Sequence, residues 1–407
     1  MTDEDRTYQG NPALPGGLIP LAEWRLPAAS VQHTLKDGLR SAWGRLRQGV
    51  RTDEIGINTG AEITSVSQLQ LRRLAPDPDW SVRAKALAVA LDELNTTQAT
   101  NFLVAPPFSG LRQPLLCLAE QRQWQVIAPP GNLLMGQEEA VAWWDALPLD
   151  RPWVIPDLAK FWLRHYAGLS LVRALFNRVI SGQCAPGVVG CSSWCWSFWY
   201  RYLDDLSVSA FTPAPMMAED LSLWLDRLPD GSLKSPLRVR KSNNGYWVLP
   251  IKEQQDTNGS RHSTYLKDLS ALARGNPGVA LAIWQRALRV KPDEPQPEAE
   301  ANSGESKDAG TRDCWVVPLD QVSLPSLSSI SQPAIQLLHG MLLHDGLDSK
   351  RLSLVTGLPD LEVQGALRIL QRHDLVERCE DDWQVTPQGY PWIRRQLQSE
   401  GYPVDGF

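Results

Sequence analysis

The sequence has 407 residues, of which 43% are hydrophobic and 21% are charged, and a formal net charge of -6. These values exclude a disordered or fibrous chain, and the length predicts two or three folded units, each with its own core. The small excess of acidic residues gives no overall attraction to nucleic acid or to an anionic membrane.

The N-terminal extension, residues 1–80, begins with an acidic, turn-rich stretch that lacks the basic and apolar blocks of a signal peptide. The chain has no run of about 18 apolar residues, so we expect a cytoplasmic protein without a transmembrane segment. From Lys36 to Arg51, five basic residues and one acidic residue follow a helix-like pattern. They predict a basic helix, which is either a solvated face or a dock for phosphate or an acidic partner.

Residues 81–231 alternate short apolar segments with helical ones. Strands are predicted at 101–106, 124–130, 152–155, 187–193 and 209–215. Helices are predicted at 82–94, 113–123, 158–180 and 218–228. Short strands separated by helices are typical of a parallel sheet with helical crossovers, so this range is predicted to form an α/β core.

Residues 232–291 have a different character. Asn244 and Gly245 supply the positive φ angles of a tight turn, so a hairpin is predicted around them. Two helical segments, 263–275 and 276–290, then predict a small helical lid. Residues 292–312 are rich in Pro, Glu, Ser and Gly, which predicts a flexible acidic linker.

Residues 313–407 contain three helical segments, a strand-turn-strand pattern after Val376 and a closing helix at 391–397. This order resembles a winged helix-turn-helix domain, in which the third helix commonly enters the DNA major groove. Here that helix offers only Arg368 and Arg372, and from Ser331 onward seven basic residues stand against eleven acidic ones, a net of -4. The charge disfavours DNA and favours a protein partner.

The segment after the first predicted core strand lies where a phosphate-binding loop would lie. Such a loop, G-x-x-x-x-G-K-[ST], holds phosphates with backbone N–H groups, a lysine and a helix N-terminus. In residues 105–112 the glycine Gly110 is present, but Leu111 and Arg112 replace the lysine and the hydroxyl residue. Ala105 replaces the first glycine, and two prolines after it remove N–H donors.

The order of loop, acidic strand, polar strand end and lid resembles the AAA+/STAND branch of P-loop ATPases. The resemblance implies a RecA/AAA-like parallel sheet with a helical lid, followed by the winged helix. It implies that Asp157 would hold Mg²⁺ and that Ser192 or Ser193 would sense the γ-phosphate. Leu158 stands where a catalytic glutamate often sits, and Gly278 stands where a nucleotide-sensing arginine often follows the lid's G-N-P. The predicted vestigial nucleotide site comprises Ser109, Gly110, Arg112, Asp157, Ser192 and Ser193.

Three functions follow as hypotheses. The first is a regulatory or adaptor protein that does not hydrolyse nucleotide efficiently and acts through protein contacts. The second is an ATP-binding protein with weak or unorthodox ATPase activity, using Asp157 on Mg²⁺ and Arg112 on phosphate. The third is a DNA-binding regulator that uses Arg368 and Arg372. ATP or ADP is expected at most as a weakly bound ligand, no catalytic or metal-ligating residue is assigned, and the partner protein and any oligomerisation stay open.

Overall fold

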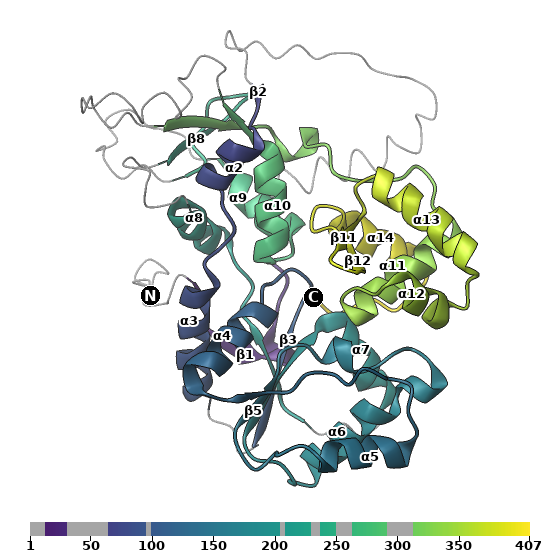
Figure 1. Ribbon diagram of the computed structural model, residues 1–407. Helices are drawn as coiled ribbons and strands as arrows, with labels where there is room; N and C mark the ends of the chain where they lie inside the picture. The colour runs from purple at the N-terminus through teal and green to yellow at the C-terminus, as the bar shows by residue number, and fades with distance from the viewer. Residues whose placement is uncertain are drawn as a thin grey trace, which may run out of the picture. The chain divides into compact units, whose positions relative to one another are not determined.

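The computed structural model describes residues 13–30, 64–94, 99–203, 208–228, 237–249, 263–290 and 312–407. The chain forms two compact units (Figure 1). Unit 1 comprises residues 1–25, 79–215 and 324–407, and unit 2 comprises residues 26–78 and 216–323. The predicted basic helix between Lys36 and Arg51 lies outside the described residues, as does the predicted linker up to residue 311.

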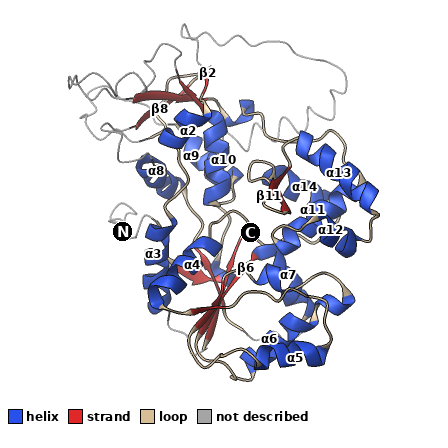
Figure 2. Cartoon of the chain, viewed as in Figure 1, coloured by secondary structure: helices blue, strands red, loops and turns tan. Residues whose placement is uncertain are grey.

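Unit 1 is built on a six-stranded sheet in the order β1-β7-β3-β6-β5-β4 (Figure 2). Its strands are β1 (Leu18–Pro20), β3 (Thr100–Ala105), β4 (Gln125–Val126), β5 (Trp153–Ile155), β6 (Gly187–Ser192) and β7 (Ala210–Pro213). All neighbours pair in parallel except β1, which runs antiparallel to β7. The five predicted strands are therefore confirmed, and β3 lies in the interior of the sheet between β6 and β7.

Five α-helices belong to the part of unit 1 around this sheet that the structure describes. They are α3 (Trp80–Asp92), α4 (Arg112–Arg122), α5 (Gln137–Asp145), α6 (Ser170–Ile180) and α7 (Ser193–Tyr202). Apolar residues of α3 and α4 pack with residues of β3, β5 and β6 into one core cluster, which includes Leu87, Leu115 and Val154. This burial supplies the main stabilising free energy of the sheet domain.

One helix prediction in this region was wrong, and two helices, α5 and α7, were not predicted. The helix predicted over 158–180 is broken into the 3₁₀ helices η2 (Leu158–Phe161) and η3 (Tyr166–Gly168) and then α6. The breaks have a local cause, because the side chains of Asp157 and His165 accept hydrogen bonds from the N–H groups two residues later and start new turns. Helix α7 was not predicted, since its aromatic-rich sequence lacks the polar face of a typical surface helix.

The C-terminal subdomain of unit 1, residues 324–407, follows the predicted order of three helices, a hairpin and a helix. Its elements are α11 (Gln332–His344), α12 (Ser349–Thr356), α13 (Asp360–Arg372), β11 (Val376–Cys379), β12 (Asp382–Val385) and α14 (Tyr390–Ser399). Leu338, Leu352, Leu367 and Ile393 are fully buried in its core. Strands β11 and β12 form an antiparallel pair, and Leu347 makes an isolated bridge to Trp383.

Unit 2 contains a four-stranded sheet in the order β2-β9-β10-β8 together with helices. Its strands are β2 (Thr64–Ser65), β8 (Leu237–Lys241), β9 (Leu288–Val290) and β10 (Arg312–Val316). Its helices are α2 (Gln68–Leu74), α8 (Ala218–Arg227), α9 (Tyr265–Leu272) and α10 (Pro277–Ala287). Asn276 of the G-N-P sequence caps α10 by accepting hydrogen bonds from the N–H groups of Gly278 and Val279.

The predicted ranges and the observed units differ in several places, since residues 1–25 of the predicted extension lie in unit 1 and residues 26–78 in unit 2. Helix α8, which the sequence placed with the α/β core, lies in unit 2. Strand β10 pairs with β8 and β9, so residues 313–323 lie in unit 2 and not with the C-terminal subdomain. A turn forms at Asn244-Gly245, but only Gly245 has the predicted positive φ, at 69°. Strand β8 takes β10 as its main partner, and in the described part of the predicted hairpin only Arg240 bridges to Trp247.

Among the described residues, no helix has both the length and the apolar character needed to cross a membrane.

Candidate functional site

The candidate site lies at the carboxyl edge of the unit 1 sheet, where open α/β sheets generally bind their ligands. Strand β3 ends at Ala105 and helix α4 begins at Arg112, so residues 106–111 form the loop that the sequence placed there. Phe108 and Gly110 adopt positive φ angles of 66° and 67°. The buried Ser109 donates its backbone N–H to the carbonyl of Pro106 at 3.2 Å. The loop therefore has the predicted position and a tightly turned backbone.

An aromatic ring packs on this loop. A Cβ atom built on Gly110 would overlap the indole of Trp80, the first residue of α3. In a phosphate-binding loop, glycine lets the backbone approach a phosphate closely. Here the missing side chain leaves room for the Trp80 ring.

Asp157, the predicted Mg²⁺ ligand, follows β5 and is 8% exposed. Its Oδ1 accepts a hydrogen bond from the Ala159 N–H at 2.9 Å, while its Oδ2 is buried without a hydrogen-bond partner among the described residues. Burial, followed by the nearby Asp345, raises the pKa of this carboxyl to about 7 against the opposing effect of Lys160 and Arg112. At neutral pH, Asp157 therefore carries a proton in a substantial fraction of the protein molecules, and a metal ion would have to displace that proton.

Lys160, on η2, donates its hydrogen bonds to residues of the C-terminal subdomain. Its ammonium donates to the carbonyls of Asp345 and Gly346 at 2.8 and 3.0 Å. The third hydrogen bond and an ion pair join it to Asp382 at 3.0 Å. These contacts use all three N–H donors of the lysine, so the cation nearest to Asp157 along the chain holds two parts of unit 1 together.

Arg164 makes a second connection between the same two parts. Its backbone N–H donates to Nε2 of His344 at 3.3 Å, and its guanidinium donates to the carbonyl of Val355 at 3.2 Å. Burial lowers the pKa of His344 to about 3 and that of His339 to about 4. Both imidazoles are therefore neutral at physiological pH and act as packing and hydrogen-bonding groups beside Arg164.

The two predicted sensor serines have internal partners. The hydroxyl oxygen of Ser192 accepts a hydrogen bond from the Cys195 N–H at 3.2 Å and caps α7. The Ser193 hydroxyl donates to the buried carboxylate of Asp405. Asp405 is held in turn by Arg394, through an ion pair at 3.1 Å and a hydrogen bond to its carbonyl at 2.8 Å. The sensor position is thus tied to the C-terminal segment.

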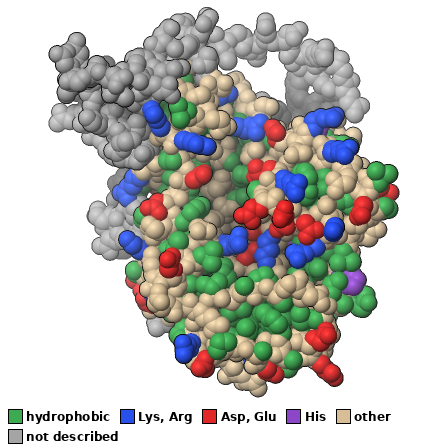
Figure 3. Space-filling view, viewed as in Figure 1, with side chains coloured by type: hydrophobic (Ala, Val, Ile, Leu, Met, Phe, Trp, Pro, Cys, Tyr) green, Lys and Arg blue, Asp and Glu red, His purple; other side chains and the backbone are tan. Residues whose placement is uncertain are grey.

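Tyr390, the first residue of α14, extends this connection to the loop. Its hydroxyl accepts from Nε1 of Trp194 at 3.0 Å, and its ring contacts that of Phe108 edge-on with centroids 5.8 Å apart. Both the loop after β3 and the polar end of β6 therefore contact the C-terminal subdomain. On the face shown in Figure 3, basic and acidic side chains lie side by side where this subdomain meets the sheet domain.

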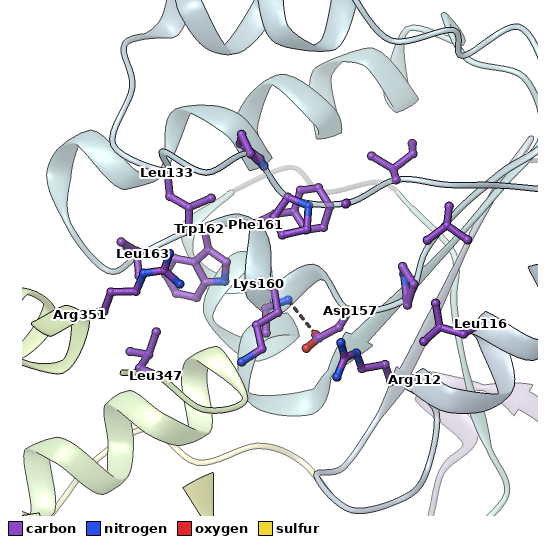
Figure 4. A pocket seen from close by; sticks show the side chains of 17 residues that line it. Arg112, Leu116, Leu133, Asp157, Lys160, Phe161, Trp162, Leu163, Leu347 and Arg351 are labelled. Carbon is purple, nitrogen blue, oxygen red and sulfur yellow. Dashed lines mark hydrogen bonds between the residues drawn. The ribbon is translucent and has the colours of Figure 1, made fainter. Parts of the chain in front are cut away.

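A cavity of about 270 Å³ opens beside these contacts (Figure 4). Arg112, Asp157, Lys160 and Arg351 line it together with a larger number of apolar side chains. Of the six residues predicted for a nucleotide site, only Arg112 and Asp157 line the cavity. Ser109, Gly110, Ser192 and Ser193 do not, so the structure does not gather the predicted set around this space.

Arg368 and Arg372, the predicted contacts for a partner or nucleic acid, are exposed on α13. They share this helix with two exposed apolar residues, Leu361 at 85% and Ile369 at 50%. Asp360 and Glu362 occupy the first turn of the same helix. The surface of α13 is therefore mixed in charge and partly apolar, unlike the uniformly basic surface typical of a DNA-reading helix.

Sequence reasoning missed Trp80, Lys160, Arg351, Arg394 and Asp405. Trp80, Lys160 and Asp405 contact partners that are distant in the sequence, as in the contact between Lys160 and Asp382, which are 222 residues apart. The only local signal was the position of Lys160, three residues after the aspartate that ends a core strand.

No family model and no curated protein match the sequence. Among solved structures, the chain is similar to variants of RuvB from Thermotoga maritima. One shares 13% identity with a TM-score of 0.30, covering 83% of this chain and 96% of that one. Another shares 12% identity with a TM-score of 0.30, covering 82% and 99%. Similarity at this level assigns neither a family nor a function to the chain.

Proposed function

We propose that this chain is a regulatory or adaptor protein built on a degenerate AAA+/STAND-like P-loop module that does not hydrolyse nucleotide efficiently. The proposal rests on one observation. Other residues of this protein bind, cover or bury the residues that are expected to contact a nucleotide. Ser193 binds Asp405, Gly110 is covered by Trp80, and Asp157 is buried with a raised pKa. These contacts give the carboxyl edge of the sheet a structural role.

The chemistry of phosphoryl transfer supports this proposal. Catalysis of that reaction depends almost entirely on positioned charge, supplied by a loop lysine and a metal held by a hydroxyl residue. Leu111 and Arg112 supply neither the lysine nor the hydroxyl. In addition, MgATP would have to compete with the contact between Ser193 and Asp405 to reach the sensor position.

The C-terminal subdomain, which we interpret as a winged helix, supports a role in protein contacts. Exposed Leu361 and Ile369 on α13 offer apolar area to a partner, and Arg368 and Arg372 add positive charge beside it. Apolar and arginine side chains are frequent at the centres of protein interfaces. The net charge of -4 over this region opposes a phosphate backbone.

Calorimetry with ATP and with MgATP, combined with a turnover assay, tests the proposal. We expect no binding tighter than about 100 μM, which corresponds to roughly -5.5 kcal/mol, and no turnover above background. The variant Asp157→Ala should leave this result unchanged. Micromolar binding of MgATP that Asp157→Ala abolishes, or measurable turnover, would overturn the proposal.

A restoration experiment distinguishes a decayed loop from a closed site. Leu111→Lys with Arg112→Thr returns the lysine and the hydroxyl to their expected positions. The contacts of Trp80 and Asp405 remain in this variant, so we expect it to stay without turnover. Recovery of ATPase activity by these two substitutions alone would show that the rest of the site is competent, which contradicts a structural role for its residues.

A further inference from the structure

We propose that the cavity lined by Arg112, Asp157, Lys160 and Arg351 binds a small organic anion, with a carboxylate or phosphate head and a flat apolar body. The cavity lies entirely within unit 1. Because the loop residues 106–111 do not line it, its ligand would not depend on a phosphate-binding loop. The inference therefore stands apart from the proposed lack of ATP hydrolysis.

The charge of the lining favours an anion. Three cations and one carboxyl group line the cavity, and Lys160 already uses its donors on protein groups. Arg112 is exposed and forms no ion pair through its guanidinium with any described residue. Among the described residues, Arg351 has only Asp348 within ion-pair distance, at 3.4 Å from Nε, and its side chain is 42% exposed. Figure 4 shows these two arginines at opposite ends of the lining, with Lys160 and Asp157 between them.

The remaining wall suits an apolar body. The last residue of β4 and the segment after it contribute consecutive apolar residues, Val126 to Pro130, and then Leu133. The buried aromatic rings of Phe161 and Trp162 come from η2 and the residue that follows it. Pockets of about 300 Å³ are at the lower end of the range that holds small ligands. A volume of about 270 Å³ thus fits one ring with an anionic head and is small for a nucleoside triphosphate.

Asp157 supplies an independent indication of a ligand. Asp157 lines the cavity, and its Oδ2 is buried with no hydrogen-bond partner among the described residues; such an atom is costly unless something satisfies it. In its protonated form the carboxyl can donate a hydrogen bond to an anionic oxygen. A ligand head that accepts from both Arg112 and Asp157 would satisfy the unpaired atom.

The test uses probes of matched shape and different charge on the full chain. Phenylacetate and phenyl phosphate are the anions, benzylamine and benzyl alcohol carry the ring without negative charge, and inorganic phosphate is a head without a body. We expect ligand-observed NMR and calorimetry to detect the aryl anions at millimolar concentrations or below and none of the three controls. The stronger of the two anions identifies the head group.

Variants locate the binding. Arg112→Gln and Arg351→Gln should each weaken binding of the better anion by about tenfold, the loss expected for one charge-assisted hydrogen bond. Arg395→Gln, on the exposed side of α14, is the matched control and should have no effect. Ala128→Trp fills the cavity from an exposed position, which preserves folding, and should abolish binding.

Three results would overturn the inference. They are equal binding of benzylamine and the anions, anion binding that survives Ala128→Trp, and no binding of either anion at 10 mM, roughly -2.7 kcal/mol. None of these results bears on ATP turnover, so failure here is distinguishable from failure of the proposed function.

Discussion

Ser193, which follows β6 and begins α7, donates its hydroxyl to Asp405, 212 residues later in the sequence. The carboxylate of Asp405 is 1% exposed, and its ion-pair partner Arg394 is 10% exposed. The C-terminal segment therefore brings a buried charge pair to the position where the sequence predicted a phosphate sensor. Removing one charge of such a pair leaves the other buried without compensation.

We predict that Asp405→Asn destabilises the chain by about 3 kcal/mol, within the range measured when one partner of a buried ion pair is removed. Urea denaturation at pH 7 measures the loss. Asp381→Asn is the control, because the Asp381 side chain is 95% exposed and its substitution should change the free energy of unfolding by less than about 0.5 kcal/mol. Equal effects of the two substitutions would contradict a structural role for Asp405.

Lys160→Met is predicted to weaken the attachment of the C-terminal subdomain. The substitution keeps most of the aliphatic stem but removes the donors to Asp345, Gly346 and Asp382. Hydrogen bonds that involve a charged group contribute about 1.5–3 kcal/mol each, so hydrogen exchange of residues 345–347 should accelerate by at least about tenfold.

The control for this prediction is Lys350→Met on α12, where the lysine side chain is exposed and makes no such contact with the described residues of the sheet domain. Mass spectrometry after hydrogen exchange should show wild-type protection in that variant. Unchanged protection in Lys160→Met would show that packing alone, without the lysine, holds the two parts together.

The strands were predictable because the central ones, β3, β5 and β6, are short and almost fully buried apolar runs between turn residues, which is typical of a parallel sheet. The break of the predicted helix just after Asp157 and the start of α7 were not, because each depends on a single side-chain cap. Ser192 illustrates this limit: its sequence position fits a sensor, yet its hydroxyl caps a helix. The positions of Lys160 and Asp405 depend on contacts across about 200 residues, and no local pattern encodes such contacts.

The pH dependence of stability is predicted to contain a contribution from Asp157. Its pKa is about 7 in the folded chain and 3.8 ordinarily, so the folded state binds more protons than the unfolded state between these values. Stability from this group therefore falls as pH rises from about 4 to 7, by at most about 1.4 kcal/mol per unit, and stays reduced above 7. Asp157→Asn should be more stable than the wild type at pH 8, by a margin that shrinks towards pH 4.

The buried histidines change the stability in the opposite direction as the pH rises. The prediction therefore concerns the difference in stability between the wild type and Asp157→Asn. The lowered pKa values of His339 and His344 mean that the unfolded state binds more protons below about pH 6.5, so stability falls as the solution becomes more acidic. Both histidines are present in the wild type and in Asp157→Asn, and their effect cancels. A margin that is constant from pH 4 to 8 would contradict the raised pKa of Asp157.

Gly110→Ala is predicted to destabilise the chain through two separable effects. The positive φ angle of Gly110 costs an L-residue about 1 kcal/mol, and overlap of the new Cβ with Trp80 adds strain. Gly357→Ala isolates the first effect, because Gly357 has φ of 73° and open space where a Cβ would lie. We expect the free energy of unfolding to fall by about 1 kcal/mol in Gly357→Ala and by 2–4 kcal/mol, roughly, in Gly110→Ala.

A double-mutant cycle with Trp80→Ala assigns the excess to the ring. Without the indole, the cost of Gly110→Ala should fall to about that of Gly357→Ala, giving a coupling energy of at least about 1 kcal/mol between positions 80 and 110. Additive effects would mean that the loop adapts without meeting the ring. In that case Trp80 would not hold the loop, and the space above Gly110 would be open to a phosphate.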